Sequence, residues 1–133
     1  MLRDLGLLLA RLLLGSLFVM AAIAKLSNVD GTAGYIGSVG LPAPVLLAWA
    51  AALFETIAGI AILVGFQTKI AALLLAAFCV FAGFVFHFQP SDQMQMISFM
   101  KNLTIAGGFL TLWVAGPGSI SVDARRGGTL ATA

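Results

Sequence analysis

Four apolar runs of about 20 residues each make up most of this chain, and their length constrains its fold more than any other feature. A helix of about 20 residues rises about 30 Å, which matches the hydrocarbon core of a bilayer. Hydrophobic residues account for 61% of the 133 residues and charged residues for only 9%, whereas soluble domains carry about 25% charged residues. Polar side chains are therefore too few to cover a water-exposed surface. The sequence predicts an all-α integral membrane protein.

Polar or glycine-rich segments separate the runs and mark where each helix ends. We expect transmembrane helices over about residues 5–26, 43–66, 69–88 and 97–115, packed as an antiparallel four-helix bundle in one domain, residues 1–118. A short interfacial helix is expected around Tyr35, between the first two spans. Residues 119–133 are predicted to form a flexible tail. The first span resembles a cleaved signal peptide near Ala24, but its apolar region is too long and contains Arg11.

Basic residues predict the orientation of the bundle, because short cytoplasmic loops of membrane proteins collect Lys and Arg. Four of them fall on the side of the two termini: Arg3, Lys69, Arg125 and Arg126. The loops of the opposite side contain Asp30 and Asp92. Both termini are therefore predicted to be cytoplasmic.

Composition argues against several kinds of site. A formal net charge of +2, with no cluster of basic and aromatic residues, predicts no nucleic-acid surface. The single cysteine, Cys79, cannot form an internal disulfide, and one histidine, His87, supports neither a zinc cluster nor a bis-histidine haem site. Met94, Met96 and Met100 are expected to line the start of the last span rather than to bind copper. No metal site is predicted.

Ionisable residues inside the spans are the most informative feature for function. A central Arg, Lys or Asp costs about 2.5 to 3.5 kcal/mol in a transmembrane helix, so such residues usually face the bundle interior and pair. Helical spacing places Arg11 on an interior stripe of the first span and Glu55 on one of the second. Since Arg11 lies about one turn from the level of Glu55, an ion pair between them is predicted. The pair would either only fix helix register or also bind a ligand.

A second set of polar residues is expected toward the opposite side of the membrane: Lys25, His87, Lys101 and Asn102. Both lysines could instead extend to the lipid headgroups, whereas Asn102 is expected to face inward. With Glu55 at the midplane, the set would form a polar cleft suited to a quinone head or a small anion. Glu55 or His87 would exchange a proton with a quinol, as catalytic groups. The two lysines and the asparagine would hold carbonyl oxygens or an anionic substrate.

Several short motifs follow one another along the chain in a characteristic order and spacing: Arg11-Leu-Leu-Leu-Gly15, Ala24-Lys25-Leu26, Gly40-Leu-Pro42, Glu55-x-x-x-Gly59, Leu63-x-Gly65-x-x-Thr-Lys69, Lys101-Asn102 and Gly107-Gly108. Over nearly its whole length the chain thus resembles the DoxX family of small four-helix membrane proteins. The resemblance implies a multi-pass location in the bacterial cytoplasmic (inner) membrane. It also implies association with oxidoreductases, including thiosulfate-to-quinone electron transfer in archaea and a complex with superoxide dismutase and a sulfurtransferase in mycobacteria. The candidate site residues become Arg11, Lys25, Glu55, His87, Lys101 and Asn102.

Three functions agree with these features. The first is a membrane component of a quinone-linked oxidoreductase system, which binds quinone or a small sulfur anion in the polar cleft. It would hold no covalently bound cofactor and would receive electrons from a soluble or membrane redox partner. A non-enzymatic anchor for such a partner and a small-molecule or proton-coupled transporter are the alternatives. The sequence leaves open whether the chain is an enzyme and whether it forms homo-oligomers.

Overall fold

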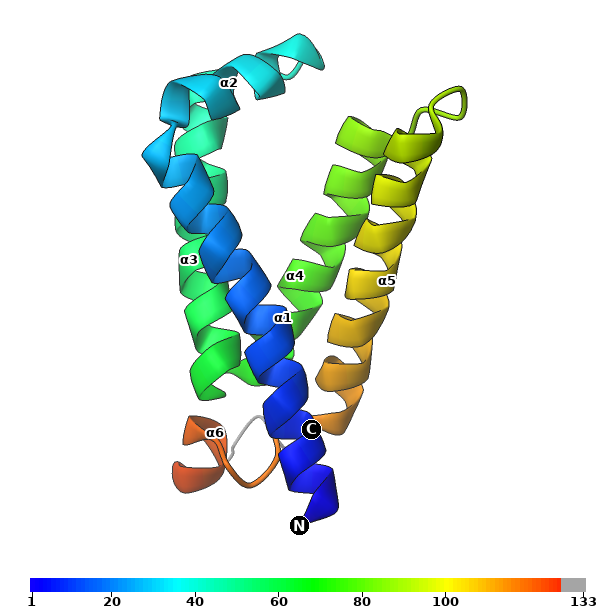
Figure 1. The fold of residues 1–133 in the computed structure, drawn as a ribbon. Coiled ribbons are helices and arrows are strands. Elements are labelled where there is room, and N and C mark those ends of the chain that lie inside the picture. Colours follow the sequence, from blue (N-terminus) through cyan, green and yellow to red (C-terminus); the bar gives the residue numbers. More distant parts are fainter. Residues whose placement is uncertain (128–133) are drawn as a thin grey trace.

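The computed structural model describes residues 1–127, which fold into helices and connecting turns (Figure 1). In chain order the elements are α1 (Leu2–Ser27), α2 (Val29–Ser38), α3 (Pro44–Val64), α4 (Thr68–Ala82), the π-helical turn η1 (Gly83–His87), α5 (Gln93–Ala115) and α6 (Val122–Arg125). Four helical segments are long and apolar enough to cross a membrane: α1, α3, α4 with η1, and α5. The predicted all-α fold with four spans is confirmed. The cytoplasmic location of the termini stays a prediction.

Polar side chains cap the first turns of α5 and α2. The last span begins at Gln93 rather than near residue 97, because the Asp92 carboxylate accepts hydrogen bonds from the backbone N–H groups of Met94 and Gln95 at 3.0 and 3.2 Å. The short helix expected around Tyr35 is α2. Its first turn is capped by Asn28, whose Oδ1 accepts from the Gly31 N–H at 2.9 Å.

The four spans form two closely packed pairs. Helix α1 packs along α3, and α4 packs along α5. Figure 1 shows the pairs close together at the end that carries the N-terminus and α6, and diverging toward the end that carries α2. Between α1 and α3 the backbones nearly touch, since a Cβ on Gly15 would lie 3.0 Å from the Gly59 carbonyl oxygen. Small residues permit such close packing of helices in membranes. We call the two ends of the bundle the termini end and the α2 end.

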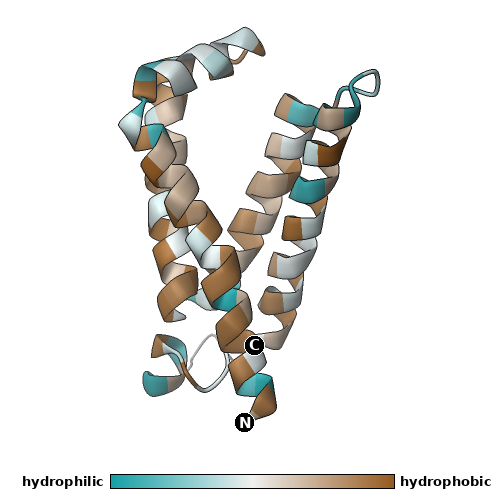
Figure 2. Ribbon diagram, viewed as in Figure 1, coloured by the Kyte–Doolittle hydropathy of each residue, from teal (hydrophilic) through white to brown (hydrophobic). Residues whose placement is uncertain are grey.

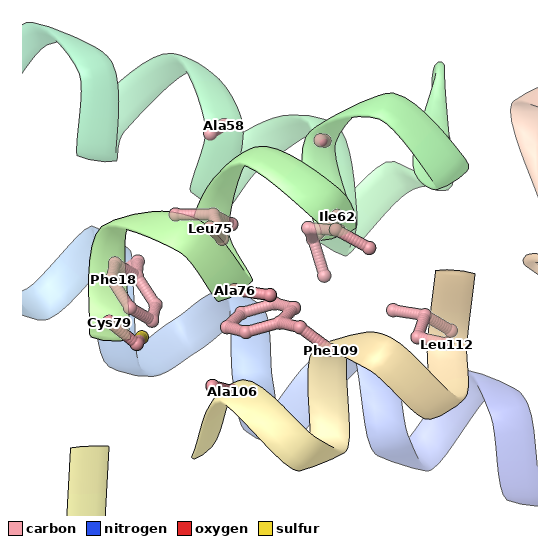
Figure 3. Packing of buried hydrophobic residues seen from close by; sticks show 11 residues of the cluster. Phe18, Ala58, Ile62, Leu75, Ala76, Cys79, Ala106, Phe109 and Leu112 are labelled. Carbon is pink, nitrogen blue, oxygen red and sulfur yellow. The ribbon is translucent and has the colours of Figure 1, made fainter. Parts of the chain in front are cut away.

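The hydrophobic core fills the region where the two pairs meet. Phe18 of α1 contacts the Phe109 ring of α5 edge-on, with ring centroids 5.5 Å apart, and Leu75 of α4 is fully buried beside them (Figure 3). Outward-facing positions of the spans are also apolar, such as Val114, which is 73% exposed. Figure 2 shows hydrophilic residues mainly near the ends of the spans and in the connecting loop. This distribution is that of a helical bundle solvated by lipid.

The C-terminal segment folds back across the termini end of the bundle. The Asp123 N–H donates to the Gly65 carbonyl oxygen at 2.9 Å, and the Ser119 N–H donates to Asp4 Oδ1 at 2.8 Å. Residues 119–127, expected to be a flexible tail, are therefore tied to the connection between α3 and α4 and to the start of α1. Residues 128–133 of the predicted tail lie outside the described residues.

Candidate functional site

A buried ion pair joins α1 to α3. Lys25 Nζ lies 2.9 Å from Glu55 Oε2 and donates a hydrogen bond to Oε1 at 3.1 Å. The Glu55 side chain is only 3% exposed, whereas that of Lys25 is 28% exposed. A side chain on a helix leans toward the N-terminus of that helix. Because α1 and α3 run in opposite directions, Lys25 and Glu55 lean toward one another and meet.

The predicted ion pair between Arg11 and Glu55 is wrong, for the same geometric reason. Gly15 and Gly59 lie at one level, as their close contact shows. Arg11 lies one turn from that level toward the termini end and Glu55 one turn toward the α2 end, so their Cα atoms are separated along the bundle by about 12 Å. Each side chain leans further away from the other. Arg11 therefore has different partners.

Arg11 bonds to backbone carbonyls at the termini end. Its Nη1 donates to the carbonyl oxygens of Pro117 and Ile120, both at 2.8 Å, and its Nη2 donates to that of Leu63 at 3.2 Å. Leu63 lies in the last turn of α3, where carbonyls lack intrahelical partners and the helix dipole favours a cation. Gly65 has φ +72°, and a Cβ there would lie 2.7 Å from Arg11 Nη1, so glycine leaves room for the guanidinium. This arrangement gives Arg11 a structural role.

Asp123 is the matching acidic residue at the same end, and no sequence pattern had indicated it. Its Oδ1 accepts from the Gln67 N–H at 2.8 Å, and its Oδ2 accepts from the Thr68 N–H at 2.9 Å and from Thr68 Oγ1 at 2.8 Å. A carboxylate at this position caps the N-terminus of α4, where the dipole favours an anion. Its distance in the chain from Thr68 hid this role, because capping residues are usually sought just before the helix they cap.

His87 and Asn102 belong to the pair of α4 and α5. His87 Nδ1 lies 2.8 Å from Oε1 of Gln95 in the first turn of α5. Asn102 Nδ2 donates to the Ser98 carbonyl oxygen at 3.0 Å. Its Cβ lies 3.2 Å from where a Cβ on Gly83 would be, so Asn102 faces η1 and inward, as expected. The π-helical turn thus packs directly against the middle of α5.

Lys101 is exposed and lines a groove along α5. The groove has a volume of about 510 Å³. Its lining residues are Gln93, Met96, Ile97, Met100, Lys101, Thr104 and Ile105. This stripe continues, at helical spacing, from Gly108, where a Cβ would lie 3.3 Å from the Leu14 side chain of α1. The groove therefore runs along α5 from its contact with α1 toward the α2 end. Its walls are apolar, and Lys101 contributes a cation.

Helix α2 connects the two helix pairs where they diverge. Its Tyr35 ring stacks on Phe86 of η1, with centroids 5.2 Å apart. On its other side α2 buries Ala33 and Ile36 against Ala48 of α3. The helix thus lies across the α2 end as a cover. The stacked pair was another contact that sequence reasoning did not find.

The six candidate residues fall into three places. Lys25 and Glu55 form their ion pair between α1 and α3, and Arg11 lies at the termini end. Of the other three, Lys101 lines the groove, whereas Asn102 and the Gln95 partner of His87 lie on the opposite side of α5. Within residues 1–127, no three His, Cys, Asp or Glu side chains lie close enough together to hold a metal ion.

Four apolar spans that carry few charges and expose apolar side chains outward define a small multi-span helical membrane protein. A family model described as DoxX matches residues 6–88, which is more than half of the chain. The chain belongs to the DoxX family.

Named relatives agree with this assignment. "Inner membrane protein YqjF" of Escherichia coli (strain K12) is 41% identical over 125 residues, 92% of each chain. "Inner membrane protein YphA" of the same organism is 37% identical over 128 residues, 92% of this chain and 91% of its own. "Putative oxidoreductase CatD" of Bacillus subtilis (strain 168) is 33% identical over 73 residues, 55% of this chain and 53% of its own. No solved structure matches. The predicted multi-pass location in the bacterial inner membrane is confirmed.

Proposed function

We propose that this chain is the membrane component of a quinone-linked oxidoreductase system and binds the quinone in the α5 groove. The main support for the proposal is the groove along α5. Its volume is about 510 Å³, and its lining residues all lie on one face of α5. Ile97, Met100 and Ile105 supply apolar walls for an isoprenoid chain, and Met96 adds an adaptable contact.

Lys101 would bind the quinone head. Its ammonium group is the only cation among the lining residues, and it would donate a hydrogen bond to a ring carbonyl oxygen. A charge-assisted hydrogen bond stabilises the negative charge that a quinone gains on reduction. Thr104, one turn away on the same face, offers a hydroxyl near the head group.

Proton exchange would fall to His87 or Glu55. His87 contacts Gln95 in the first turn of α5, at nearly the same level as the lining residue Met96 but on the opposite side of that helix. Reduction of a quinone to a quinol takes two electrons and two protons. The electrons would come from a soluble or membrane redox partner. The name of the Bacillus subtilis relative, which includes the word oxidoreductase, supports a redox role.

A non-enzymatic anchor is the second candidate function. It is favoured by the partners that Arg11 and Glu55 already have within the protein, three carbonyls for one and Lys25 for the other. Glu55 therefore needs no ligand to balance its charge, and both Nη atoms of Arg11 find their acceptors within the protein. In that case the groove on α5 would hold a membrane lipid or a helix of the partner.

Binding of decylubiquinone to the full-length protein in nanodiscs tests the proposal. We expect saturable binding that weakens about tenfold in Lys101→Met, because a hydrogen bond to a charged group is lost. Arg126→Met removes the same charge at the termini end and should bind as the wild type does. Equal affinities of the wild type and Lys101→Met would remove Lys101 from the site. Absence of saturable binding in folded protein would favour the anchor.

A further inference from the structure

A second pocket lies at the termini end, away from the α5 groove. It has a volume of about 250 Å³ and lies between α1, the end of α3 and the C-terminal segment. Arg11 and Arg125 line it together. The rest of its wall is mainly apolar: Leu8, Val64, Ile120 and Val122. Two arginine residues thus line one small pocket.

Arg11 has a donor without a partner in this pocket. Its side chain is only 2% exposed, and its Nε is buried without a hydrogen-bond partner. The Nη atoms are already engaged with the carbonyls of Leu63, Pro117 and Ile120. A buried, unsatisfied donor on a charged group costs more than a neutral one. An acceptor supplied from outside the chain would remove that cost.

The charge of Arg11 also has no anionic partner in direct contact. Its hydrogen bonds go to neutral carbonyls, and within residues 1–127 no carboxylate forms an ion pair with it. Asp123 is the acidic residue of the segment that covers Arg11, but its two oxygens accept from Gln67 and Thr68. Arg125 is exposed at the rim and adds a second positive charge. The two arginine charges of the lining thus exceed the single negative charge of Asp123, which interacts with Arg11 electrostatically.

We propose that this pocket binds the phosphate oxyanion of an anionic phospholipid head group. The Arg11 Nε–H would be the inner donor and the Arg125 guanidinium the outer one, since guanidinium groups match the geometry of phosphate oxygens. The apolar rim favours a lipid over free phosphate. Val64 and Ile120 are each 45% exposed and would contact the glycerol and the first methylenes of the acyl chains. Basic pockets between helix ends bind such head groups in other membrane proteins.

Equilibrium binding of dioctanoyl-phosphatidylglycerol to the full-length protein in a neutral detergent tests this site. Dioctanoyl-phosphatidylcholine and inorganic phosphate serve as comparison probes. Arg125→Gln removes a lining guanidinium, and Arg126→Gln removes the same charge from the next residue, which does not line the pocket. We expect affinity for the phosphatidylglycerol to fall about fivefold in Arg125→Gln and to stay within about twofold in Arg126→Gln. The NMR signal of the Arg11 Nε–H should shift on binding.

Three other outcomes would contradict the proposed lipid site. Equal weakening in both variants, with no shift of the Arg11 signal, would show nonspecific attraction to a basic segment and overturn the proposal. Binding of phosphate but not of phosphatidylglycerol, dependent on Arg125, would contradict the lipid assignment. Similar affinity for both lipids would also contradict it, because the anionic charge would then not be recognised. The quinone experiment uses the other pocket, so the two proposals fail separately.

Discussion

The two ends of the bundle stabilise their charged residues by different means. At the termini end, Arg11 donates to carbonyls of α3 and of the C-terminal segment, and Asp123 accepts from N–H groups at the start of α4, so the main partners of both side chains are backbone groups. Toward the α2 end, Lys25 and Glu55 satisfy one another through side chains, and Lys101 is exposed in a groove. Charges bonded to backbone hold the fold together. Lys101, the exposed charge beside the α5 groove, is available for a ligand.

The largest effect on stability is expected from Arg11→Leu. The substitution leaves three carbonyls at the termini end without donors, and unsatisfied buried groups cost about 1–3 kcal/mol each. With some relief from water at the membrane surface, we expect a loss of about 3 kcal/mol in the free energy of unfolding. Unfolding by titration with sodium dodecyl sulfate would measure it. Unchanged stability, with Arg126→Leu as the control, would break the distinction between the two ends.

Substitutions of Lys25 and Glu55 should lower the free energy of unfolding by unequal and non-additive amounts. Lys25→Met leaves a buried carboxylate alone and should cost about 2 kcal/mol, less than for a fully buried pair because Lys25 is partly exposed. Glu55→Gln should cost less than either Lys25→Met or Arg11→Leu, since the lysine can extend toward the lipid headgroups. The double variant Lys25→Met/Glu55→Gln should be more stable than the sum of the two single losses predicts. Strict additivity in the same unfolding assay would contradict the pairing.

Asp123→Ala should cost about 1–2 kcal/mol, the usual effect of removing a helix cap. Asp123→Asn keeps an acceptor oxygen and should lose less than half as much stability. Hydrogen exchange would locate the effect at Gln67 and Thr68, whose N–H groups bond to the carboxylate. Faster exchange at the α2 end instead would show that the two ends are coupled rather than independent.

The smallest effect is expected from Tyr35→Leu at the α2 end. Loss of the stacking on Phe86 should cost about 0.5–1.5 kcal/mol, as for other aromatic pairs. Because α2 also packs against Ala48, the helix should remain folded while its contact with η1 loosens. Hydrogen exchange of α2 should become faster, and that of α3 should not change. Equal exchange in the wild type and the variant would show that the stacking does not hold α2 in place.

The sequence predicted the spans because membrane burial depends on length and hydropathy, which are local properties. It predicted inward-facing polar residues at Arg11, Glu55 and Asn102 through helical spacing, and the structure places all three at least partly inside the protein. It did not predict the partner of Glu55. Spacing gives the face on which a residue lies, but pairing depends on helix level and on the direction in which each side chain leans.

Local sequence patterns could not predict the contacts of the C-terminal segment. Residues 119–127 look like a polar tail, yet Asp123 caps a helix that begins more than 50 residues earlier in the chain. The sequence also did not predict the groove along α5, although it identified Lys101 as a candidate site residue. The groove depends on the angle at which the two helix pairs diverge. The sequence of one helix alone does not determine that angle.

Photolabelling with an azidoquinone followed by mass spectrometry tests the central claim most directly. The label should attach saturably to α5 between Gln93 and Ile105, and excess decylubiquinone should displace it. Label on the termini end, or incorporation that excess quinone does not reduce, would contradict the assignment of the α5 groove as the quinone site.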